Sequence, residues 1–525
     1  MIAVLAGCQG TIGDQGDPVE PILPPIGADD LSNGRIRTRL WRLTPIQFET
    51  EARRLLGDLP DAGQYPLGEP QDGFTNFAAG ATIDRSVAQR IAQITEDYAA
   101  WAEDNAADIT GCGADFGSAA CTDGFIADFL TRAYRRPSTP EEQNTLRALY
   151  DSIEAEHGAS YAFRSIVQAV LMSPHVLYRS ELGAPFDGDT VAEPAEGEEI
   201  VVLSDYEIAS LLAFALTDES PDAALLEAAA AGRLRDPAER RMQALRLMGR
   251  SQVIWRRFFW EWLDMDRFDP QADAIGLSDT LRSAMLEEYA EFVGRIVVDE
   301  RGTLDDLFSA SRSWASPELA ELYGVDHPGS GLAPINFNPS ERSGLLTQGA
   351  WLVSHGSREE EYVVRRGMGI YLHALCRDLT PPEGLDVNAA QSELAPRDAP
   401  IREQVEARSN ADVCGACHQV PDPIGLAFER YGADARIRDA YPDGHPIDSS
   451  TVVPLIGQVD SAADLGAQLA ASEDFQTCFV RRFAHSILGT DLGRNSGWVN
   501  DVTDSFLDEG RSIEAMVLHL SLIHI

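Results

Sequence analysis

Apolar residues recur at intervals of three and four positions through most of the chain, as expected for helices that bury one face. One such run consists of Ile208, Leu211, Leu212 and Leu216. Several runs follow a Ser or Thr that can cap the first helical turn, namely Thr44, Thr139, Ser204 and Ser316. The first three are followed three residues later by Gln or Glu, which completes a capping box. The pattern predicts a mainly α protein.

Strand-like alternation is confined to two short stretches, residues 200–203 and 452–455, so we expect no sheet-based domain. Residues 255–263 hold three tryptophans and two phenylalanines, which we interpret as core packing between helices and not as a substrate platform. Loops rich in Gly, Pro and acidic residues separate the helical segments, at residues 184–198, 325–340 and 379–400. A chain of 525 residues with these breaks should form several compact domains.

Charge narrows the possible partners. The chain has 84 acidic residues against 42 basic ones, all of them arginine, and a formal net charge of -42. A surface of this sign repels polyanions, so nucleic acid is not expected as a partner. The simplest interpretation of the acidity is a solvated surface, and the alternative is a face that binds a basic redox partner protein.

Both ends of the sequence carry segments that we do not expect to belong to the folded domains. Residues 5–8 (Leu-Ala-Gly-Cys) resemble a bacterial lipobox in which Cys8 would carry a lipid anchor, and what precedes them is only part of a signal peptide. Residues 9–34, rich in Gly, Pro and Asp, suit a flexible tether. The last six residues, 520–525, resemble a translated sequencing adapter, so His524 is not a candidate ligand. No stretch reaches the about 20 apolar residues of a membrane span, and we expect the protein to be held on a membrane.

The five residues from Cys414 to His418 (Cys-Gly-Ala-Cys-His) are the most specific chemical signal in the chain. Two thiols separated by two residues can add to the two vinyl groups of a haem, and the adjacent imidazole can then bind the iron. A thioredoxin-like redox pair would need a βαβ context, and structural zinc would need two further ligands nearby. We therefore expect one covalent haem c attached at Cys414 and Cys417, with His418 as the proximal iron ligand.

The cysteine count fits an oxidising compartment. Once the lipobox and haem cysteines are assigned, four remain: Cys112, Cys121, Cys376 and Cys478. Four cysteines allow three pairings, of which the simplest joins Cys112 to Cys121 and Cys376 to Cys478. Export to the periplasm or to the outer membrane as a lipoprotein is the expected location.

Two features around the iron stay open. We expect residues 421–425 to form a turn in which a main-chain carbonyl accepts the Nδ1 proton of His418, and a turn with no role at the iron is an equal alternative. The distal ligand could come from His355, Met368, His445, His485 or Met516. We prefer His355, with Met368 second.

Several further segments occur in a characteristic order. They are residues 42–45 (RLTP), 55–58 (LLGD), 129–137 (FLTRAYRRP), 165–168 (SIVQ), 173–179 (SPHVLYR), 203–212, 259–263, 319–324 (LAELYG), 342–347 (RSGLLT), 414–418 and 422–425 (DPIG). In this order they resemble a family of secreted bacterial proteins built from consecutive domains of unknown function, numbered in the fifteen-eighties and fifteen-nineties. That family carries a cytochrome c motif in its penultimate domain. The resemblance implies a covalent haem, export and a multi-domain helical architecture.

The chain departs from this family close to the haem motif. The usual Met-Asp-Pro is here Pro421-Asp422-Pro423, so no iron ligand is expected in that segment. The usual Thr-Ser-Pro ahead of Arg366 is replaced by Glu361-Tyr362-Val363. Details of the distal side of the haem are therefore not transferred from the family.

The expected organisation is a series of helical domains with a cytochrome-c-like haem segment near the C-terminus. The segments are a truncated signal (1–8), a tether (9–34), helical domains (35–110, 111–185 and 198–325), a haem c domain (340–448), a C-terminal helical domain (449–519) and the adapter-like end (520–525). The leading hypothesis for function is one-electron transfer. The alternatives are a haem-dependent oxidoreductase with an open distal site and a surface binding lipoprotein with a structural haem.

Overall fold

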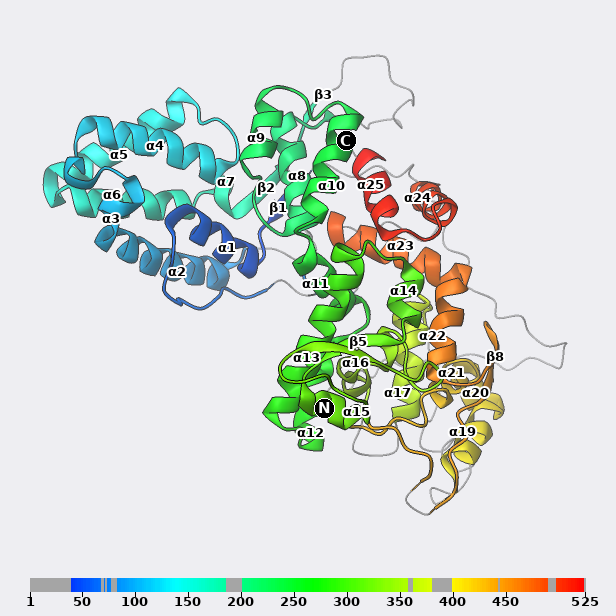
Figure 1. Ribbon diagram of the computed structural model, residues 1–525. Coiled ribbons are helices and arrows are strands. Elements are labelled where there is room, and N and C mark those ends of the chain that lie inside the picture. Colours follow the sequence, from blue (N-terminus) through cyan, green and yellow to red (C-terminus); the bar gives the residue numbers. More distant parts are fainter. Residues whose placement is uncertain are drawn as a thin grey trace. The chain divides into compact units, whose positions relative to one another are not determined.

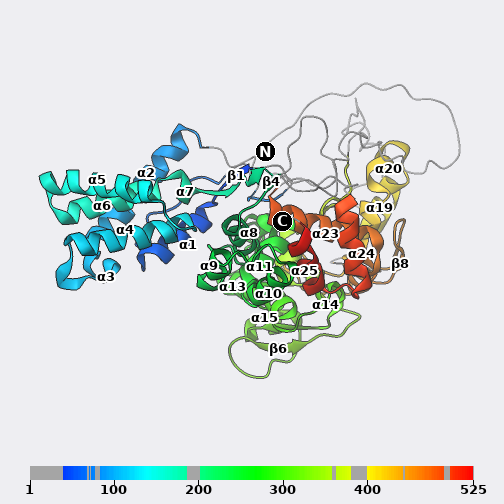
Figure 2. The same cartoon turned by 90° about the horizontal axis from the view of Figure 1, so that it is seen from above.

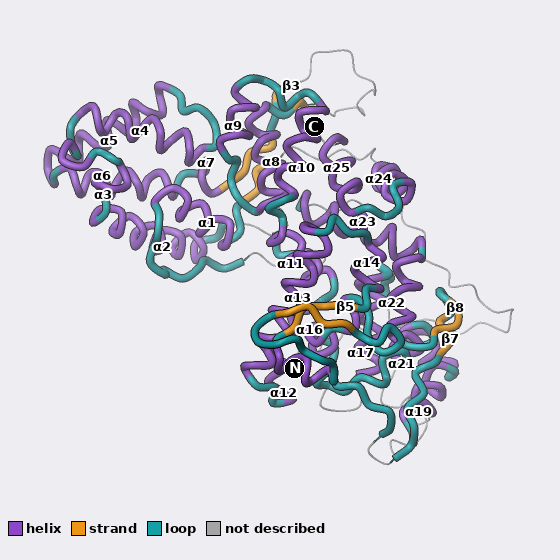
Figure 3. The backbone as a smooth tube through the Cα atoms, viewed as in Figure 1, coloured by secondary structure: helices purple, strands orange, loops and turns teal. Residues whose placement is uncertain are grey.

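The structure is a computed structural model that is mainly α, as the apolar pattern predicts (Figure 3). It describes residues 39–67, 70, 73–76, 83–185, 201–356, 362–379, 399–441, 444–489 and 497–523. The strands in these ranges form four small antiparallel sheets of two strands each. Cys8, the tether and His524 lie outside the described residues, as do most of the expected loops at 184–198 and 379–400. No described helix is long and apolar enough to cross a bilayer.

The chain divides into two compact units, which we describe separately. The N-terminal unit comprises residues 35–254, 484–491 and 517–525, and the haem-motif unit comprises residues 255–483 and 492–516. The first unit contains β1 (Arg39–Arg42), α1 (Pro45–Leu56), α2 (Arg85–Asp104), α3 (Ala106–Thr110), η2 (Gly113–Asp115), α4 (Ala119–Tyr134), α5 (Pro140–His157), α6 (Ala159–Leu171), α7 (Pro174–Leu177), β2 (Tyr178–Glu181), β3 (Ala184–Pro185), β4 (Val201–Val202), α8 (Asp205–Thr217), α9 (Ala223–Ala230) and α10 (Pro237–Met248) (Figure 1).

The N-terminal unit is held by helix packing around a continuous apolar core. Helix α6 packs against both α2 and α5, and the rings of Phe125 and Phe129 on α4 stack with centroids 4.8 Å apart. Strand β1 pairs with β2, in a register that sets Trp41 opposite Arg179. A disulfide joins Cys112 to Cys121 with an S–S distance of 2.03 Å.

Helix starts in this unit follow the predicted chemistry. Thr44 accepts a hydrogen bond from the Gln47 amide, and the Gln47 side chain accepts one from the Thr44 amide. The same reciprocal capping box forms at Thr139 and at Ser204, while Ser316 in the other unit caps α15 without a box. These caps satisfy amide groups that would otherwise lack partners at the helix end. The predicted capping boxes are confirmed.

The haem-motif unit contains most of the remaining elements. They are α11 (Gln252–Trp262), η3 (Met265–Arg267), α12 (Phe268–Ile275), α13 (Asp279–Gly294), η4 (Arg295–Asp299), α14 (Leu304–Ser309), β5 (Arg312–Ala315), α15 (Pro317–Tyr323), β6 (Ala333–Asn336), η5 (Leu345–Thr347), α16 (Gly349–Ser354), α17 (Tyr362–Gly369), η6 (Ile370–Ala374), α19 (Ile401–Ser409), α20 (Asp412–His418), α21 (Pro421–Leu426), β7 (Thr451–Val453), β8 (Gly457–Val459), α22 (Ala462–Ala471), α23 (Glu473–Leu488), α24 (Gly497–Asp508) and α25 (Ile513–Ile523). Helices α11, α23 and α25 also contribute residues to the N-terminal unit.

The aromatic segment at 255–263 forms a core, as predicted. Trp255 on α11 stacks on Phe483 of α23 with ring centroids 4.3 Å apart, and Trp262 is fully buried. The predicted short strands are also present as β4 and β7. Part of the stretch 325–340, expected to be a loop, forms strand β6, because it pairs along its length with β5.

Candidate haem site

Two glycines allow α17 to lie directly against α21, the helix that follows the haem motif. A Cβ atom at Gly367 would stand 1.8 Å from the Pro421 carbonyl oxygen, and one at Gly425 would stand 1.9 Å from the Val363 carbonyl oxygen. No side chain larger than hydrogen fits at either position. The contact therefore fixes α17 beside the backbone that begins three residues after His418.

A buried arginine fastens the same helix to the segment that follows α21. The guanidinium of Arg366 is fully buried and donates to the carbonyls of Phe428, Tyr431, Gly432 and Leu352, at 2.7 to 3.2 Å. Hydrogen bonds to these backbone carbonyls offset much of the free-energy cost of burying the charge. The frame around the motif is therefore held by backbone contacts as well as by apolar packing.

The motif itself forms the short helix α20, which packs against α19 (Figure 2). Cys414 and Cys417 are the described cysteines outside disulfides, and both are half-buried. Gly415 brings the helix close to the end of α19, because a Cβ there would stand 2.6 Å from the Ser409 carbonyl oxygen. Two thiols and an imidazole are thus presented together on one turn of helix.

The alternatives for this motif gain no support from its surroundings. A thioredoxin-like redox pair would lie in a βαβ context, whereas α20 stands between the helices α19 and α21. No group of three His, Cys, Asp or Glu side chains converges on a metal position anywhere in the described part of the chain. The donor set of two thiols and one imidazole fits a covalently attached haem better than a dithiol redox centre or zinc.

His418 is held by a carboxylate. Its Nδ1 atom lies 3.0 Å from Oδ1 of Asp422, and Arg408 Nε donates to Oδ2 of the same carboxylate at 2.7 Å. Asp422 is completely buried, whereas the side chains of His418 and Arg408 are 27% and 22% exposed. With Nδ1 occupied in this way, Nε2 of His418 is the nitrogen available to iron.

This arrangement corrects two expectations about residues 421–425. The segment opens helix α21 with Pro421 in its first turn, so it is not merely a turn. The partner of His418 is the Asp422 side chain and not a main-chain carbonyl. The sequence did contain a signal for the His418–Asp422 contact. An Asp four residues after a His can lie beside that His when the backbone stays helical.

His355, the preferred distal candidate, is buried at the end of α16. Its Nδ1 atom lies 3.1 Å from the Trp351 carbonyl oxygen, and its ring stacks on the Trp351 ring at 4.6 Å. Burial lowers its pKa to about 3, so the imidazole is neutral, and its Nε2 atom is buried with no hydrogen-bond partner. The imidazole edge lies against Gly369, where a Cβ would be 2.7 Å from Nε2.

Met368 lies between the two contact glycines of α17. Successive residues are about 100° apart around a helix, so Gly367, which faces Pro421, and Gly369, which faces His355, point in nearly opposite directions. Met368 is half-buried, and α17 passes directly after Gly369 into the π-helical turn η6. His355 therefore contacts the side of α17 that faces away from α21.

The other distal candidates differ in exposure. His445 is exposed, whereas His485 and Met516 are fully buried.

Close to Met368 in sequence, Cys376 forms a disulfide with Cys478 of α23, with an S–S distance of 1.99 Å. The structure thus has the two disulfides of the simplest pairing.

A buried polar cluster in the same unit was not expected from the sequence. Tyr323 donates to Glu288 at 2.5 Å, and the guanidinium of Arg342 lies 4.0 Å from the centre of the Tyr323 ring. Burial raises the pKa of Glu288 to about 7. The members come from α13, α15 and the segment before η5, so no local pattern connects them.

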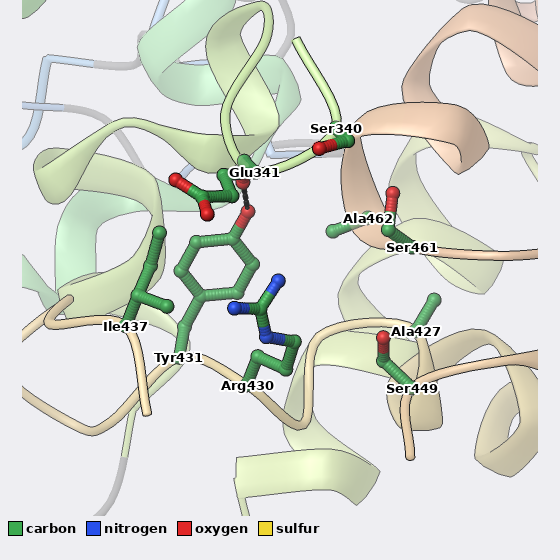
Figure 4. A pocket seen from close by; sticks show the side chains of 9 residues that line it. All are labelled: Ser340, Glu341, Ala427, Arg430, Tyr431, Ile437, Ser449, Ser461 and Ala462. Carbon is green, nitrogen blue, oxygen red and sulfur yellow. Dashed lines mark hydrogen bonds between the residues drawn. The ribbon is translucent and has the colours of Figure 1, made fainter. Parts of the chain in front are cut away.

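A small pocket is lined in part by residues that follow α21. Side chains from four separate stretches line it: Ser340, Glu341, Ala427, Arg430, Tyr431, Ile437, Ser449, Ser461 and Ala462 (Figure 4). The Tyr431 hydroxyl crosses its edge to donate to the Glu341 carbonyl oxygen. No residue of the Cys-Gly-Ala-Cys-His motif, Cys414–His418, lines the pocket.

Three family models match the chain, each described as a protein of unknown function. They are PSD5 (DUF1595) at residues 121–181, PSD4 (DUF1592) at residues 203–325 and PSCyt3 (DUF1588) at residues 342–441. Together they cover more than half of the chain, and the third, whose short name indicates a cytochrome-like domain, contains the complete motif and Asp422. No curated protein and no solved structure matches.

Proposed function

Because this chain belongs to the multi-domain cytochrome c proteins built from consecutive domains of unknown function (DUF1595, DUF1592 and DUF1588), we propose that it transfers single electrons through one covalently bound haem c. The observation that carries the proposal is the His418–Asp422 contact. It orients a half-buried imidazole, with Nε2 available, beside the two free thiols of the motif. A haem bound there would supply a one-electron iron couple.

The residues of the chain have separate roles in this proposal. Cys414 and Cys417 form the thioether bonds, and His418 is the proximal ligand. The close contact between Gly367 and Pro421 keeps α17 beside this segment. Val363, Leu426 and Val405 pack together and join α17, α21 and α19 by apolar contacts.

We propose Met368 as the distal ligand in place of His355, the residue preferred from the sequence. It follows Gly367, which touches the backbone three residues beyond His418, and it is half-buried. His355 contacts α17 at Gly369, nearly opposite Gly367, so the helix stands between His355 and α21. A thioether ligand raises the reduction potential of a haem, which suits electron transfer.

We also propose that the protein is exported and anchored by a lipid on Cys8, which lies outside the described residues. Two disulfides are typical of oxidising compartments. The strong negative charge suits a basic redox partner protein, because opposite charges accelerate the encounter. Incorporation of a labelled fatty acid into the full-length gene product, and its loss in a Cys8→Ala variant, would test the anchor.

The central test is to produce the full chain, with an export signal, in a host that matures c-type cytochromes. We expect the denatured protein to gain the mass of one haem and to stain for haem on a gel. A Cys414→Ala/Cys417→Ala double variant should lose both signals, while Cys112→Ala/Cys121→Ala should keep them. Unmodified wild-type mass would overturn the proposal.

Optical spectra separate electron transfer from haem catalysis. A low-spin haem that does not bind carbon monoxide in its reduced form is the expected result, because both axial positions are filled. A high-spin haem that binds carbon monoxide and reacts with peroxide would overturn the electron-carrier function in favour of a haem-dependent oxidoreductase. Retained fold and partner binding without haem would favour a binding protein.

A further inference from the structure

We infer that Asp422 and Arg408 set the reduction potential of the haem iron in opposite directions through His418. This inference rests on the proposed function, because it concerns the haem bound there. It assigns a role to two residues outside the Cys-Gly-Ala-Cys-His motif. They act through the proximal imidazole, so they are positioning and tuning residues and not iron ligands.

Asp422 is placed to increase the electron density on the imidazole. Its Oδ1 atom lies 3.0 Å from Nδ1 of His418. A carboxylate at this position attracts the Nδ1 proton, so Nε2 becomes a stronger donor to the metal. A stronger donor stabilises the ferric state over the ferrous state and lowers the potential.

Burial strengthens the electrostatic effect of the Asp422 carboxylate on the reduction potential. The side chain is completely buried, so little water screens its interaction with a nearby iron centre. A main-chain carbonyl at this position would offer a hydrogen bond without a full negative charge. The carboxylate should therefore lower the potential further than a carbonyl would.

Arg408 opposes this effect from the other side of the carboxylate. Its Nε atom donates to Oδ2 of Asp422 at 2.7 Å, and a positive charge there withdraws electron density from the group that polarises His418. The three side chains form a chain from α19 through α21 to the end of α20. Removing the guanidinium should strengthen the pull of Asp422 on the Nδ1 proton.

The arrangement predicts opposite effects for two substitutions. Asp422→Asn keeps an oxygen that can accept from Nδ1 but removes the negative charge, so the potential should rise. Arg408→Gln removes the positive charge, so the potential should fall. Each change should alter the equilibrium constant between the oxidised and reduced forms about tenfold, which is about 59 mV for a one-electron couple.

The test is redox titration of the full holoprotein, followed by its optical spectrum. Arg402→Gln is the matched control, because this variant loses the same charge from the same helix. Arg402 pairs with Glu406 at 3.5 Å and donates to the Asp448 and Ser450 carbonyls, and not to Asp422. We expect Arg402→Gln to leave the potential nearly unchanged. Arg408→Lys keeps the positive charge and should stay near wild type, whereas Arg408→Met removes it and replaces Arg408→Gln if the Gln variant fails to fold.

The outcomes distinguish this inference from the function on which it rests. Wild-type protein without covalent haem would overturn both. Covalent haem with potentials that move in the same direction in Asp422→Asn and Arg408→Gln would overturn this inference alone, because general loosening of the proximal side gives a common direction. A shift of the potential in Arg402→Gln as large as that in Arg408→Gln would also overturn it.

Discussion

Gly367 and Pro421 meet backbone to backbone: a Cβ on Gly367 would stand 1.8 Å from the carbonyl oxygen of Pro421. The contact joins α17, which carries Met368, to the helix that follows the haem motif. Because rigid backbone lies on both sides, no rotation of a side chain can relieve a clash there. This contact therefore couples the position of α17 to that of α21.

Gly367→Ala should lower the free energy of unfolding by about 3 kcal/mol, the upper end of the usual cost of an overpacked core. Gly329→Ala is the matched control, because a Cβ there meets no atom within 4 Å, and its effect should stay within about 0.5 kcal/mol. Denaturant unfolding followed by circular dichroism measures both. Equal stability of the two variants would show that the helices are not in close contact.

The sequence predicts those parts of the site that depend on local spacing. The motif, the capping boxes at Thr44 and Thr139, and the mainly α fold all follow from residues a few positions apart. The identity of the His418 partner was predicted wrongly, because the choice between a carbonyl and the Asp422 carboxylate depends on whether the chain re-enters a helix at Pro421. A proline can start a helix or end one, and the sequence alone leaves both open.

Contacts between distant segments could not be predicted from the sequence, for a different reason. A glycine such as Gly367 is compatible with a turn, a flexible position or a close helix contact, and only the packed structure shows which applies. The same holds for strand β6, whose conformation depends on its pairing with β5. Long-range packing overrides local propensity at such positions.

The distal side of the haem can be tested with two substitutions, one at Met368 on α17 and one at His355, which packs against Gly369 of that helix. Met368→Ala should convert the haem from low spin to high spin and allow carbon monoxide to bind, because one axial ligand is lost. His355→Ala removes a similar volume beside Gly369 and should leave the spin state unchanged. Optical and electron paramagnetic resonance spectra report the ligand set. A spin change in His355→Ala alone would reverse our assignment.

The two disulfides should contribute unequally to stability. Cys376 and Cys478 are 102 residues apart in sequence, whereas Cys112 and Cys121 are 9 apart. If the bridges act mainly on the unfolded chain, loop entropy assigns about 5 kcal/mol to the first and about 3 kcal/mol to the second. Replacing each pair by serine and measuring urea unfolding tests the order. A larger loss from the shorter loop would contradict the entropic explanation.

Glu288 should make the haem-motif unit less stable as the pH rises. The carboxyl is fully buried, and burial raises its pKa from 4.5 to about 7 in the folded protein. Below about pH 4.5 it is neutral in both states, so the stabilisation is complete. Between pH 4.5 and 7 the unfolded chain loses this proton while the folded chain keeps it, and stability falls by up to about 3 kcal/mol before levelling off above pH 7.

Glu288→Gln isolates this effect, because the amide is isosteric and does not ionise. We expect wild-type protein to lose about 3 kcal/mol more unfolding free energy than Glu288→Gln between pH 4.5 and 8. Glu287→Gln, a neighbour on α13 whose side chain is exposed, should keep the wild-type dependence. Denaturant unfolding at several pH values supplies the comparison. If Glu288→Gln retains the wild-type slope, the carboxyl ionises as readily in the folded chain as in the unfolded one, and the burial of its charge must be compensated by Tyr323 and Arg342.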